Sequence, residues 1–475
     1  MTEKKQDFKR QKIFFAYPPA PIMNREDRCQ QPTESLVVIP PLPPIDMMSL
    51  SAVAKKRGYE TKFKDYSLNN ETVYDFLRDL RVFKPDFLVL NIASTRLEED
   101  LSILTQAKDL LDDIVVIVKG AVFNFNSYSI MQKYPEIDIA LRGEIEESFD
   151  EIIRYNNLKD INGITYQINN RIVSTPDRQL SNDLNHLPIL DRDLIDNNIY
   201  VRPDTKKPQT IIRVSKGCPN HCFFCLATPL NGKVVRYRKT ELVIEEIKQC
   251  VEKYNIKDFI FWSDIFNQDN NWVQKLCRQI LENELKINFS ANTRVDTLDF
   301  ETLCLMKKAG CNLISMGIES GSQEILNKMG KRITLEQIRN AVKLIKKAKI
   351  QTYAYYVIGL PWETKETIEE TYKFAKELNT HYASFYTATA LMGTKYYDYV
   401  TKNRLGEINY ENPYIYPSTK SYTLNSQQIY DYNRKMNRDY YLRPNYILKM
   451  AFEVNSLTKF KSYYDTFIKL IKKNV

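Results

Sequence analysis

The stretch QTIIRVSKGCPNHCFFC, residues 209–225, joins an apolar segment of strand type to a loop that carries three cysteines. Cys218, Cys222 and Cys225 lie within eight positions, and no fourth cysteine follows at a matching spacing. Thiolates are soft ligands that favour zinc, copper(I) or iron–sulfur clusters. The stretch therefore predicts a metal-binding loop directly after a strand.

Strand-like and helix-like segments alternate after this loop, which predicts parallel strands joined by helices. Six such units suggest a partial barrel rather than a closed eight-stranded one. In barrels of this kind the chemistry lies at the carboxyl ends of the strands, where the cysteine loop falls. The predicted strands are 209–215, 258–264, 287–292, 313–319, 351–359 and 383–391, and the predicted helices are about 240–254, 270–284, 299–309, 334–348 and 365–378.

A separate alternating series precedes the barrel. Five strands with helical crossovers predict an open, doubly wound sheet of Rossmann type. The predicted strands are 12–17, 59–66, 86–92, 113–119 and 137–141, and helices fit at 46–57, 71–83, 97–111 and 145–155.

The segment between the two series has a different character. GITYQINNRIVSTP, residues 163–176, predicts a hairpin with an Asn-Asn turn, since asparagine tolerates positive φ. The α/β chain is therefore expected to have four parts. These are a Rossmann-like domain at 1–155, a linker with a hairpin at 156–205, a partial (β/α)6 barrel of TIM type at 206–400, and a mainly helical region at 401–475.

The composition is that of a globular protein in a reducing compartment. Hydrophobic residues make up 43% of the 475 positions and charged residues 27%. No apolar run reaches membrane-spanning length, and the N-terminus MTEKKQDFKRQK lacks the apolar core of a signal peptide. We therefore expect a cytoplasmic protein without a transmembrane segment, whose five scattered cysteines are buried as small hydrophobes.

The net charge of +9 raises the question of a nucleic-acid partner. The lysines are spread over many predicted helix faces and form no dense basic block. A positive charge spread over the surface in this way affects solubility and does not indicate a nucleic-acid site. We therefore expect no nucleic-acid partner.

The ligand set bears on the choice between zinc and an iron–sulfur cluster. A structural zinc site needs four ligands, and His221 is the nearest further donor. It directly precedes a ligand cysteine, however, and zinc fingers pair two ligand-bearing turns where this chain has one. A four-iron cluster on three thiolates leaves one iron open, and an open position is what a catalytic metal site needs.

The C-x-x-x-C-x-x-C spacing after a barrel's first strand resembles the signature of the radical S-adenosylmethionine (SAM) superfamily. The resemblance implies a catalytic [4Fe-4S] cluster on Cys218, Cys222 and Cys225. It also implies that the open iron binds SAM and that an electron from the cluster cleaves SAM to a 5′-deoxyadenosyl radical. Further segments resemble the family's strand-end motifs: FWSDIFN (261–267), NTRVD (292–296), SMGIESGSQEILNKMGK (315–331), VIGLPWET (357–364) and MGT (392–394).

Residue by residue, these motifs imply that SAM is bound by Asp264, Arg294, Glu319, Gly321 and Gly359. A guanidinium can pair the SAM carboxylate, the acidic residues can accept from the ribose or the amino group, and the glycines allow close backbone approach. The alternative is that Arg294 and Glu319 only pair with each other. The departures from the family pattern are Ser263 for aspartate, Trp362 for glycine and Met392 for proline.

The N-terminal series resembles the cobalamin-binding-like domain that is fused to many radical SAM enzymes. The matching segments are 40–66, 85–94 (PDFLVLNIAS), 115–121 (VVIVKGA) and 137–153, and YYLRPNYIL (440–448) fits the same subfamily, so the resemblance covers about residues 10–450. It implies a cobalamin pocket at the carboxyl ends of the strands. The candidate pocket residues are Ser94, Thr95, Gly120, Gly143 and Glu144.

This domain departs from the family pattern in two ways. No histidine precedes His186, so the D-x-H-x-x-G motif whose histidine ligates cobalt is absent. Lys119-Gly120 stands where a glycine pair is usual, and the lysine is expected to crowd a bulky corrin. The alternative for this domain is a scaffold without a cofactor.

The resemblance implies cobalamin-dependent methylation of an unactivated carbon. The alternative is a radical SAM cyclase, oxidase or rearrangement enzyme with a degenerate cobalamin domain. It further implies a small-molecule, lipid or peptide substrate and an electron donor such as flavodoxin or ferredoxin. RNA modification, as in the related methylthiotransferases, is disfavoured because a second three-cysteine cluster and an appended RNA-binding barrel are missing from the sequence.

The C-terminal segment SLTKFKSYYDTFIKLIKKNV, residues 456–475, predicts an amphipathic helix with lysines outside its apolar stripe. A basic helix of this kind can lie on a membrane, but such a stripe more often packs on its own domain, and packing is the expectation. The stripe consists of Leu457, Phe460, Tyr464, Phe467 and Leu470 or Ile471.

Overall fold

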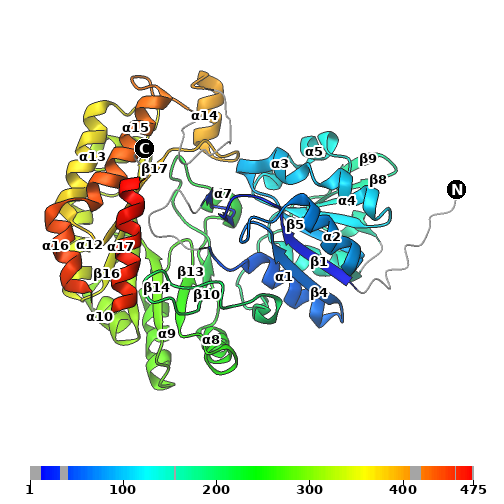
Figure 1. Cartoon of the computed structure of the whole chain (residues 1–475), viewed down its shortest axis with the longest axis horizontal. Coiled ribbons are helices and arrows are strands. Elements are labelled where there is room, and N and C mark those ends of the chain that lie inside the picture. The colour runs from blue at the N-terminus through cyan, green and yellow to red at the C-terminus, as the bar shows by residue number, and fades with distance from the viewer. Residues whose placement is uncertain (1–11, 33–40, 155–156, 407–418, 455, 473–475) are drawn as a thin grey trace. The chain divides into compact units, whose positions relative to one another are not determined.

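The computed structural model describes residues 12–32, 41–154, 157–406, 419–454 and 456–472. The chain divides into two compact units (Figure 1). The first comprises Met1–Pro32 and Pro43–Asp196, and the second comprises Thr33–Leu42 and Asn197–Val475. Among the described residues, no helix is both long and apolar enough to cross a membrane.

The first unit contains the predicted doubly wound sheet. Five parallel strands run in the order β4-β1-β5-β6-β7. β4 therefore lies on one side of β1, and β5, β6 and β7 follow in sequence order on the other side. These strands are β1 (Lys12–Tyr17), β4 (Glu60–Asp65), β5 (Phe87–Asn91), β6 (Val115–Lys119) and β7 (Ile139–Leu141). The helices are α1 (Ile45–Lys56), α2 (Val73–Phe83), α3 (Leu97–Leu101), α4 (Leu104–Leu110), α5 (Phe123–Lys133) and α6 (Ile145–Arg154), with short 3-10 turns η2 (Ser94–Arg96), η3 (Leu158–Asp160) and η4 (Arg192–Leu194).

The predicted hairpin is present as β8 (Ile164–Ile168) and β9 (Arg171–Ser174). Its turn residues Asn169 and Asn170 both have positive φ, 48° and 59°, as the Asn-Asn turn predicts. The hairpin is not a free connector, however, because β8 pairs antiparallel with β7 and extends the first sheet to seven strands.

A second hairpin, β2 (Met23–Glu26) and β3 (Cys29–Pro32), follows β1 and was not predicted. It is anchored by Arg25, whose guanidinium is buried and donates to both carboxylate oxygens of Asp100 and to the carbonyl of Asn91. Its short, polar strands lack the alternating apolar pattern that marks a strand in sequence, and long-range polar contacts such as this buried ion pair hold it in position.

The second unit contains the predicted partial barrel. Six strands, all parallel, run in sequence order from one edge to the other. They are β10 (Gln209–Arg213), β13 (Asp258–Trp262), β14 (Asn288–Thr293), β15 (Cys311–Glu319), β16 (Gln351–Ile358) and β17 (Tyr382–Thr387), and a small hairpin of β11 (Ser215–Lys216) and β12 (Arg236–Tyr237) lies next to the cysteine loop. The helices are α7 (Ala227–Asn231), α8 (Thr240–Tyr254), α9 (Asn270–Glu282), α10 (Phe300–Lys308), α11 (Gln323–Lys328), α12 (Leu335–Lys347), α13 (Lys365–Leu378), α14 (Lys395–Asn403), α15 (Ser426–Tyr441), α16 (Pro444–Glu453) and α17 (Leu457–Lys472).

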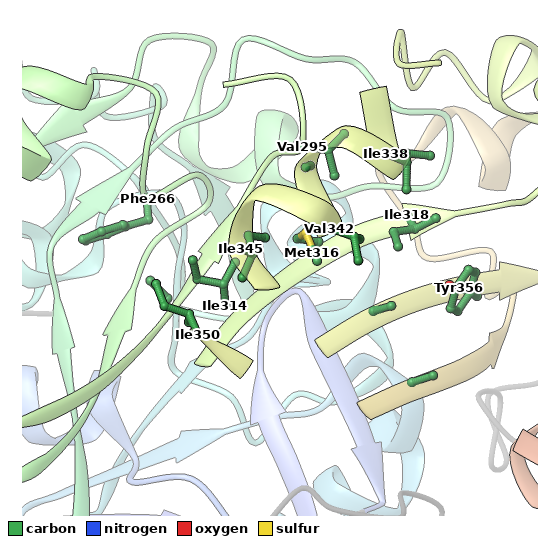
Figure 2. Packing of buried hydrophobic residues seen from close by; sticks show 14 of the residues in the cluster. Phe266, Val295, Ile314, Met316, Ile318, Ile338, Val342, Ile345, Ile350 and Tyr356 are labelled. Atoms are coloured by element: carbon green, nitrogen blue, oxygen red, sulfur yellow. The ribbon is translucent and has the colours of Figure 1, made fainter. Parts of the chain in front are cut away.

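Packing between the strands and the outer helices decides which side chains face the inside of the barrel. On β15, Ile314, Met316 and Ile318 are fully buried and lie towards Ile338 and Val342 of α12 (Figure 2). Side chains alternate between the two faces of a strand, so the intervening positions of β15 face the opposite side. Glu319 is the last residue of β15 and therefore lies at the carboxyl end of the barrel.

The free edge of the barrel is sealed by side chains of α15. Asn433 donates to the Phe385 carbonyl at 2.6 Å, and Asn437 accepts from the Phe385 N–H at 3.1 Å. The Tyr441 hydroxyl accepts from the Ala383 N–H at 3.0 Å and donates to its carbonyl. Because positions 433, 437 and 441 share one helical face, a single helix satisfies the outward backbone groups of β17.

The predicted packing of the C-terminal stripe is wrong for the residues that the structure describes. Leu457, Phe460 and Tyr464 of α17 are 88%, 56% and 55% exposed. The side chains of Phe467, Leu470 and Ile471 lie outside the described part of the chain, as does that of Cys29. Among the other scattered cysteines, Cys250, Cys277 and Cys311 are buried as predicted, and Cys304 is half-buried.

Candidate active site

The three cysteines lie on the loop that leaves β10 and β11 at the carboxyl end of the barrel. All three cysteines are half-buried, and none forms a disulfide with a described residue. Backbone hydrogen bonds shape the loop: Cys218 N donates to the Gly232 carbonyl at 3.0 Å, and Cys225 N donates to the Cys222 carbonyl at 3.2 Å. The Ala227 N–H also points at the Cys225 sulfur, 3.4 Å away, as a donor to a thiolate would.

Asp264 anchors the start of this loop. Its carboxylate accepts from the Gly217 N–H at 2.6 Å and from the Asn231 amide at 3.0 Å. Gly217 has φ +103°, and a Cβ on it would lie 2.0 Å from the Val234 carbonyl oxygen, so no other residue fits there. Asp264, predicted to contact SAM, therefore holds the cysteine loop against β13.

The segment after α11 supports the loop from another side. Phe223 N donates to the Met329 carbonyl at 2.9 Å, which places residues 329–331 beside Cys222. Burial raises the pKa of the Cys222 thiol, and the positive charges of Lys331 and Arg294 act against that rise. A low thiol pKa is what metal ligation requires, because the thiolate is the ligand.

Lys331 forms a buried ion pair with Glu319, Nζ to Oε1 at 2.7 Å. A Cβ on Gly317 would lie 2.2 Å from the Glu319 carboxylate oxygen and 2.8 Å from the Lys331 nitrogen, so the missing side chain at 317 makes room for both charged groups. Burial alone would lower the pKa of Lys331, but Glu319 and then Cys222 raise it. Lys331 was not singled out from the sequence, although it ends the motif 315–331 that was.

Arg294 pairs with Asp296 and not with Glu319. Its guanidinium donates to both Asp296 oxygens at 2.9 Å and to the Lys331 carbonyl at 3.2 Å. Burial opposes its charge, but the pair with Asp296 and then the nearby cysteine thiols raise its pKa. The alternative that Arg294 and Glu319 pair with each other is therefore wrong, and each has its own partner.

Gly321 and Gly359 have packing reasons to be glycines. A Cβ on Gly321 would lie 2.6 Å from the Cβ of Phe374 on α13, and one on Gly359 would lie 2.7 Å from Ile429 on α15. At both glycines, the atoms that leave no room for a side chain thus belong to a helix of the protein itself.

Tyrosines of the last two barrel strands, Tyr355 and Tyr356 on β16 and Tyr386 on β17, differ in burial. Tyr356 is fully buried in the hydrophobic core and stacks on Phe385, 4.8 Å between ring centroids. Tyr355 and Tyr386 are half-buried, with their centroids 6.0 Å apart. The tyrosine-rich stretch 396–416 lies outside the described residues from 407 onward.

The donor set fits an iron–sulfur cluster. Three cysteine thiols on one loop, with the cationic Lys331 and Arg294 beside Cys222, provide both the ligands and the charge that an anionic cluster needs. Within the described ranges, no three His, Cys, Asp or Glu side chains converge as a single metal ion would require.

The candidate cobalamin residues of the first unit follow neighbouring strands of its sheet. Ser94 and Thr95 form η2 after β5, Gly120 follows β6, and Gly143 and Glu144 follow β7. Because β5, β6 and β7 are adjacent and parallel, all five residues lie at one edge of the sheet. Gly120 has φ +156°, and a Cβ there would lie 2.2 Å from the Ile92 carbonyl oxygen.

Lys119 does not project freely from this edge. It is 2% exposed, and its ammonium pairs with Asp27 at 3.1 Å and with Asp46. The Thr95 hydroxyl and the Gln30 amide nitrogen at the same edge are buried without a hydrogen-bond partner in the described structure. A polar, amide-rich ligand such as cobalamin fits an edge with unpartnered donors and acceptors and a lysine held back by two carboxylates.

Two family models match the chain. The model described as the radical SAM superfamily matches residues 212–375, and the B12 binding domain matches residues 37–153. The first match covers the barrel strands β13–β16 and the cysteine loop, and the second covers the described sheet edge with Ser94, Thr95, Gly120, Gly143 and Glu144.

Relatives among characterised and named proteins include methyltransferases and a cyclase. A Pyrococcus horikoshii protein named an uncharacterized methyltransferase is 31% identical over 431 residues, covering 89% of this chain and 93% of its own length. The anaerobic magnesium-protoporphyrin IX monomethyl ester cyclase of Rubrivivax gelatinosus is 27% identical and covers 72% of this chain. This chain spans 63% of that cyclase.

Solved structures share the fold. OxsB, a cobalamin-dependent SAM radical enzyme with aqua-cobalamin bound, matches 98% of this chain and 72% of its own with a TM-score of 0.72 at 15% identity. The methyltransferase TsrM from Kitasatospora setae, with cobalamin and a [4Fe-4S] cluster bound, matches 84% of this chain and 76% of its own with a TM-score of 0.65 at 16% identity. At these identities the likeness concerns the fold.

Proposed function

Because the chain belongs to the radical SAM superfamily, among the members that carry a B12 binding domain, we propose that it methylates an unactivated carbon of its substrate. It is a radical SAM enzyme of the cobalamin-dependent, methyltransferase-like kind. The observation that carries the proposal is a loop with three cysteines outside any described disulfide, at the carboxyl end of a partial barrel, in a chain that also matches a B12 binding domain.

When bound, a [4Fe-4S] cluster supplies the electron that cleaves SAM to a 5′-deoxyadenosyl radical, and cobalamin supplies the methyl group. Cys218, Cys222 and Cys225 are the residues that would hold the cluster. Asp264 anchors the start of their loop, because its carboxylate accepts from the Gly217 N–H.

The charged residues beside Cys222 match the charges of SAM. Lys331 and Arg294 are cations at a buried position and suit the SAM carboxylate, while Glu319 suits its amino group. Lys331 and Arg294 already pair with carboxylates of the protein, so binding of the SAM carboxylate would replace one ion pair with another. Gly321 and Gly359 are left out of this site, since helix packing explains both.

At the edge of the first sheet, Ser94, Thr95, Gly120, Gly143 and Glu144 would hold cobalamin. The unpartnered hydroxyl of Thr95 can bond to an amide of the corrin periphery. Gly143 has open space around its Cβ position. The chain's three histidines are His186, His221 and His381, so the matched domain, which ends at residue 153, offers no imidazole to cobalt.

The remaining partners follow from the chemistry. The substrate is a small molecule, a lipid or a peptide, and the electron comes from a donor such as flavodoxin or ferredoxin. Free thiols that ligate iron need a reducing compartment, which supports a cytoplasmic site of action.

The test is anaerobic reconstitution with iron, sulfide and hydroxocobalamin, followed by gel filtration, metal analysis and product analysis. Near-stoichiometric cobalt with about four irons, and S-adenosylhomocysteine formed along with 5′-deoxyadenosine, would support a methyltransferase. Iron without cobalt, and 5′-deoxyadenosine alone, would favour the second candidate, a cyclase or oxidase. We retain this second candidate because the cyclase of Rubrivivax gelatinosus is among the relatives.

A further inference from the structure

The last two helices carry large apolar side chains that face solvent. On α16, Leu448 and Phe452 are 59% and 85% exposed, and on α17, Leu457, Phe460 and Tyr464 are at least 55% exposed. We call these five residues the C-terminal apolar surface. Single exposed apolar residues are ordinary, but rows of them along neighbouring helices mark an interaction site.

The two rows belong together. Residues 457, 460 and 464 are spaced by three and four, which places them on one face of α17, and residues 448 and 452 share a face of α16. The rings of Phe460 and Tyr464 stack, with centroids 6.3 Å apart. Phe452 and Leu457 are five residues apart in the sequence, so the two rows follow one another closely along the chain.

The exposed row is not the face by which α17 attaches to its unit. Tyr463 makes that attachment: it packs against the hydrophobic core, and its hydroxyl lies 3.4 Å from that of Tyr382. Lys459 covers the ring of Tyr463 at 5.7 Å. Of the α17 side chains that the structure describes, Tyr463 is thus packed against the unit, while Leu457, Phe460 and Tyr464 are left exposed.

The charge of the C-terminal segment, as a sequence property, favours an anionic occupant. Residues 443–475 contain seven lysines and arginines against two acidic residues, Glu453 and Asp465. An apolar helix face bordered by lysines is the pattern of helices that lie in the interface of an anionic membrane. Each lysine near such a surface strengthens binding about fivefold. A second copy of the same basic surface would instead be repelled.

We propose that the C-terminal apolar surface docks the protein on the anionic face of a lipid bilayer. Leu448, Phe452, Leu457 and Phe460 enter the boundary between headgroups and acyl chains, and the lysines of both helices contact the phosphates. The helices lie on the bilayer and do not cross it. This inference is independent of the reaction that the barrel catalyses.

The experiment is flotation of the full-length protein with vesicles of phosphatidylcholine containing phosphatidylglycerol, compared with vesicles of phosphatidylcholine alone. The variant replaces Phe452, Leu457 and Phe460 with serine. The matched control is Tyr74→Ser with Val82→Ser, two side chains of α2 that are each 74% exposed. All five positions are exposed, so circular dichroism and the Tm should not change.

We expect the native chain and the control to float with the anionic vesicles, and the triple variant to bind at least tenfold more weakly. Added salt should weaken binding of the native chain. Absence of flotation by the native chain, equal flotation of the triple variant, or equal binding to neutral vesicles would each overturn the proposal. A native dimer that the triple variant converts to monomers, with no flotation of either, would identify a second copy as the occupant instead.

Discussion

At the scale of single residues, the site depends on how buried charges are paired. Glu319 has φ +69°, a left-handed conformation that a glutamate rarely adopts, at a break in the register between β15 and β16. That conformation is retained because the carboxylate reaches Lys331, and Lys331 in turn lies beside Cys222. Backbone strain at a charged residue next to a metal-binding loop is typical of functional sites.

The first prediction concerns the cysteine loop. Cys222→Ala removes one of three thiolates, so we expect loss of the visible absorbance of the cluster and of 5′-deoxyadenosine formation. Cys304→Ala, which changes a half-buried cysteine of α10, is the control and should keep both. Metal analysis and chromatography of the reaction products make the measurement, and retention of both signals by Cys222→Ala would refute the assignment.

The second prediction concerns the ion pair of Lys331. Lys331→Met leaves the Glu319 carboxylate buried without its cation, which should cost about 3–5 kcal/mol of unfolding free energy. The double variant Lys331→Met with Glu319→Gln removes both charges and should recover most of that loss. Urea unfolding of the metal-free protein measures both values. If the double variant is as unstable as the single one, the pair is not the cause.

The third prediction concerns Glu363, a fully buried carboxyl of α13's N-terminal loop. It accepts from Leu360 N at 3.0 Å, and burial raises its pKa from 4.5 to about 8. Between pH 4.5 and about 8, this carboxyl is ionised in the unfolded chain but still protonated in the folded chain. Stability therefore falls as pH rises through this window, by about 1.4 kcal/mol per pH unit from this group.

Glu363→Gln is neutral throughout and should flatten that decline. The Tm of native protein and variant, measured from pH 5.5 to 8, makes the comparison. Parallel profiles would show that Glu363 is ionised in the folded protein.

At the scale of elements, the edge of the barrel depends on α15. Asn437→Leu leaves the Phe385 N–H without its acceptor, and an unsatisfied buried donor costs about 1–3 kcal/mol. Lys435→Leu, at an exposed position two residues earlier on the same helix, is the control and should stay within about 0.5 kcal/mol. Denaturant unfolding measures the unfolding free energy of both variants. Equal losses would mean that a leucine on α15, and not the lost contact with Phe385, causes the destabilisation.

The elements that could be predicted from sequence are those with a repeating apolar pattern. KIFFAY at 12–17 coincides with β1, and all six barrel strands were located to within a few residues. The hairpin β2–β3 and the seal of α15 escaped prediction because their contacts are polar and long-range. Arg25 meets Asp100 across 75 positions, and Asn433 meets Phe385 across 48. The spacing of Asn433, Asn437 and Tyr441 along one helix face was the available signal.

At the scale of the whole molecule, the residues proposed for the cluster and those proposed for cobalamin belong to different units. The cysteines could be proposed as ligands because their spacing is local, whereas Lys331 was not singled out because its partner Glu319 is twelve positions away. Lys119 was expected to crowd a corrin from its position in the motif. Its ammonium pairs with Asp27 and Asp46 instead, and no local sequence pattern reveals these ion pairs.

The final prediction tests that separation. Gly120→Val places side-chain atoms where the Ile92 carbonyl oxygen lies, 2.2 Å from the Cβ position, and distorts the turn after β6. Cobalt retained after reconstitution should fall at least tenfold, while the iron content stays at about four per chain. Cobalt and iron are measured on the same gel-filtration peak. Loss of iron along with cobalt would mean that the two sites depend on each other.

The seal on β17 also has a consequence for synthesis on the ribosome. The barrel's last strand ends at Thr387, but Asn433, Asn437 and Tyr441, which cover its edge, are translated about fifty residues later. At 5–20 residues per second, the nascent barrel spends about 3–10 s with an open strand edge. During those seconds the edge is a template for pairing with another nascent chain, so the yield of folded enzyme should depend on chaperones that bind before α15 emerges.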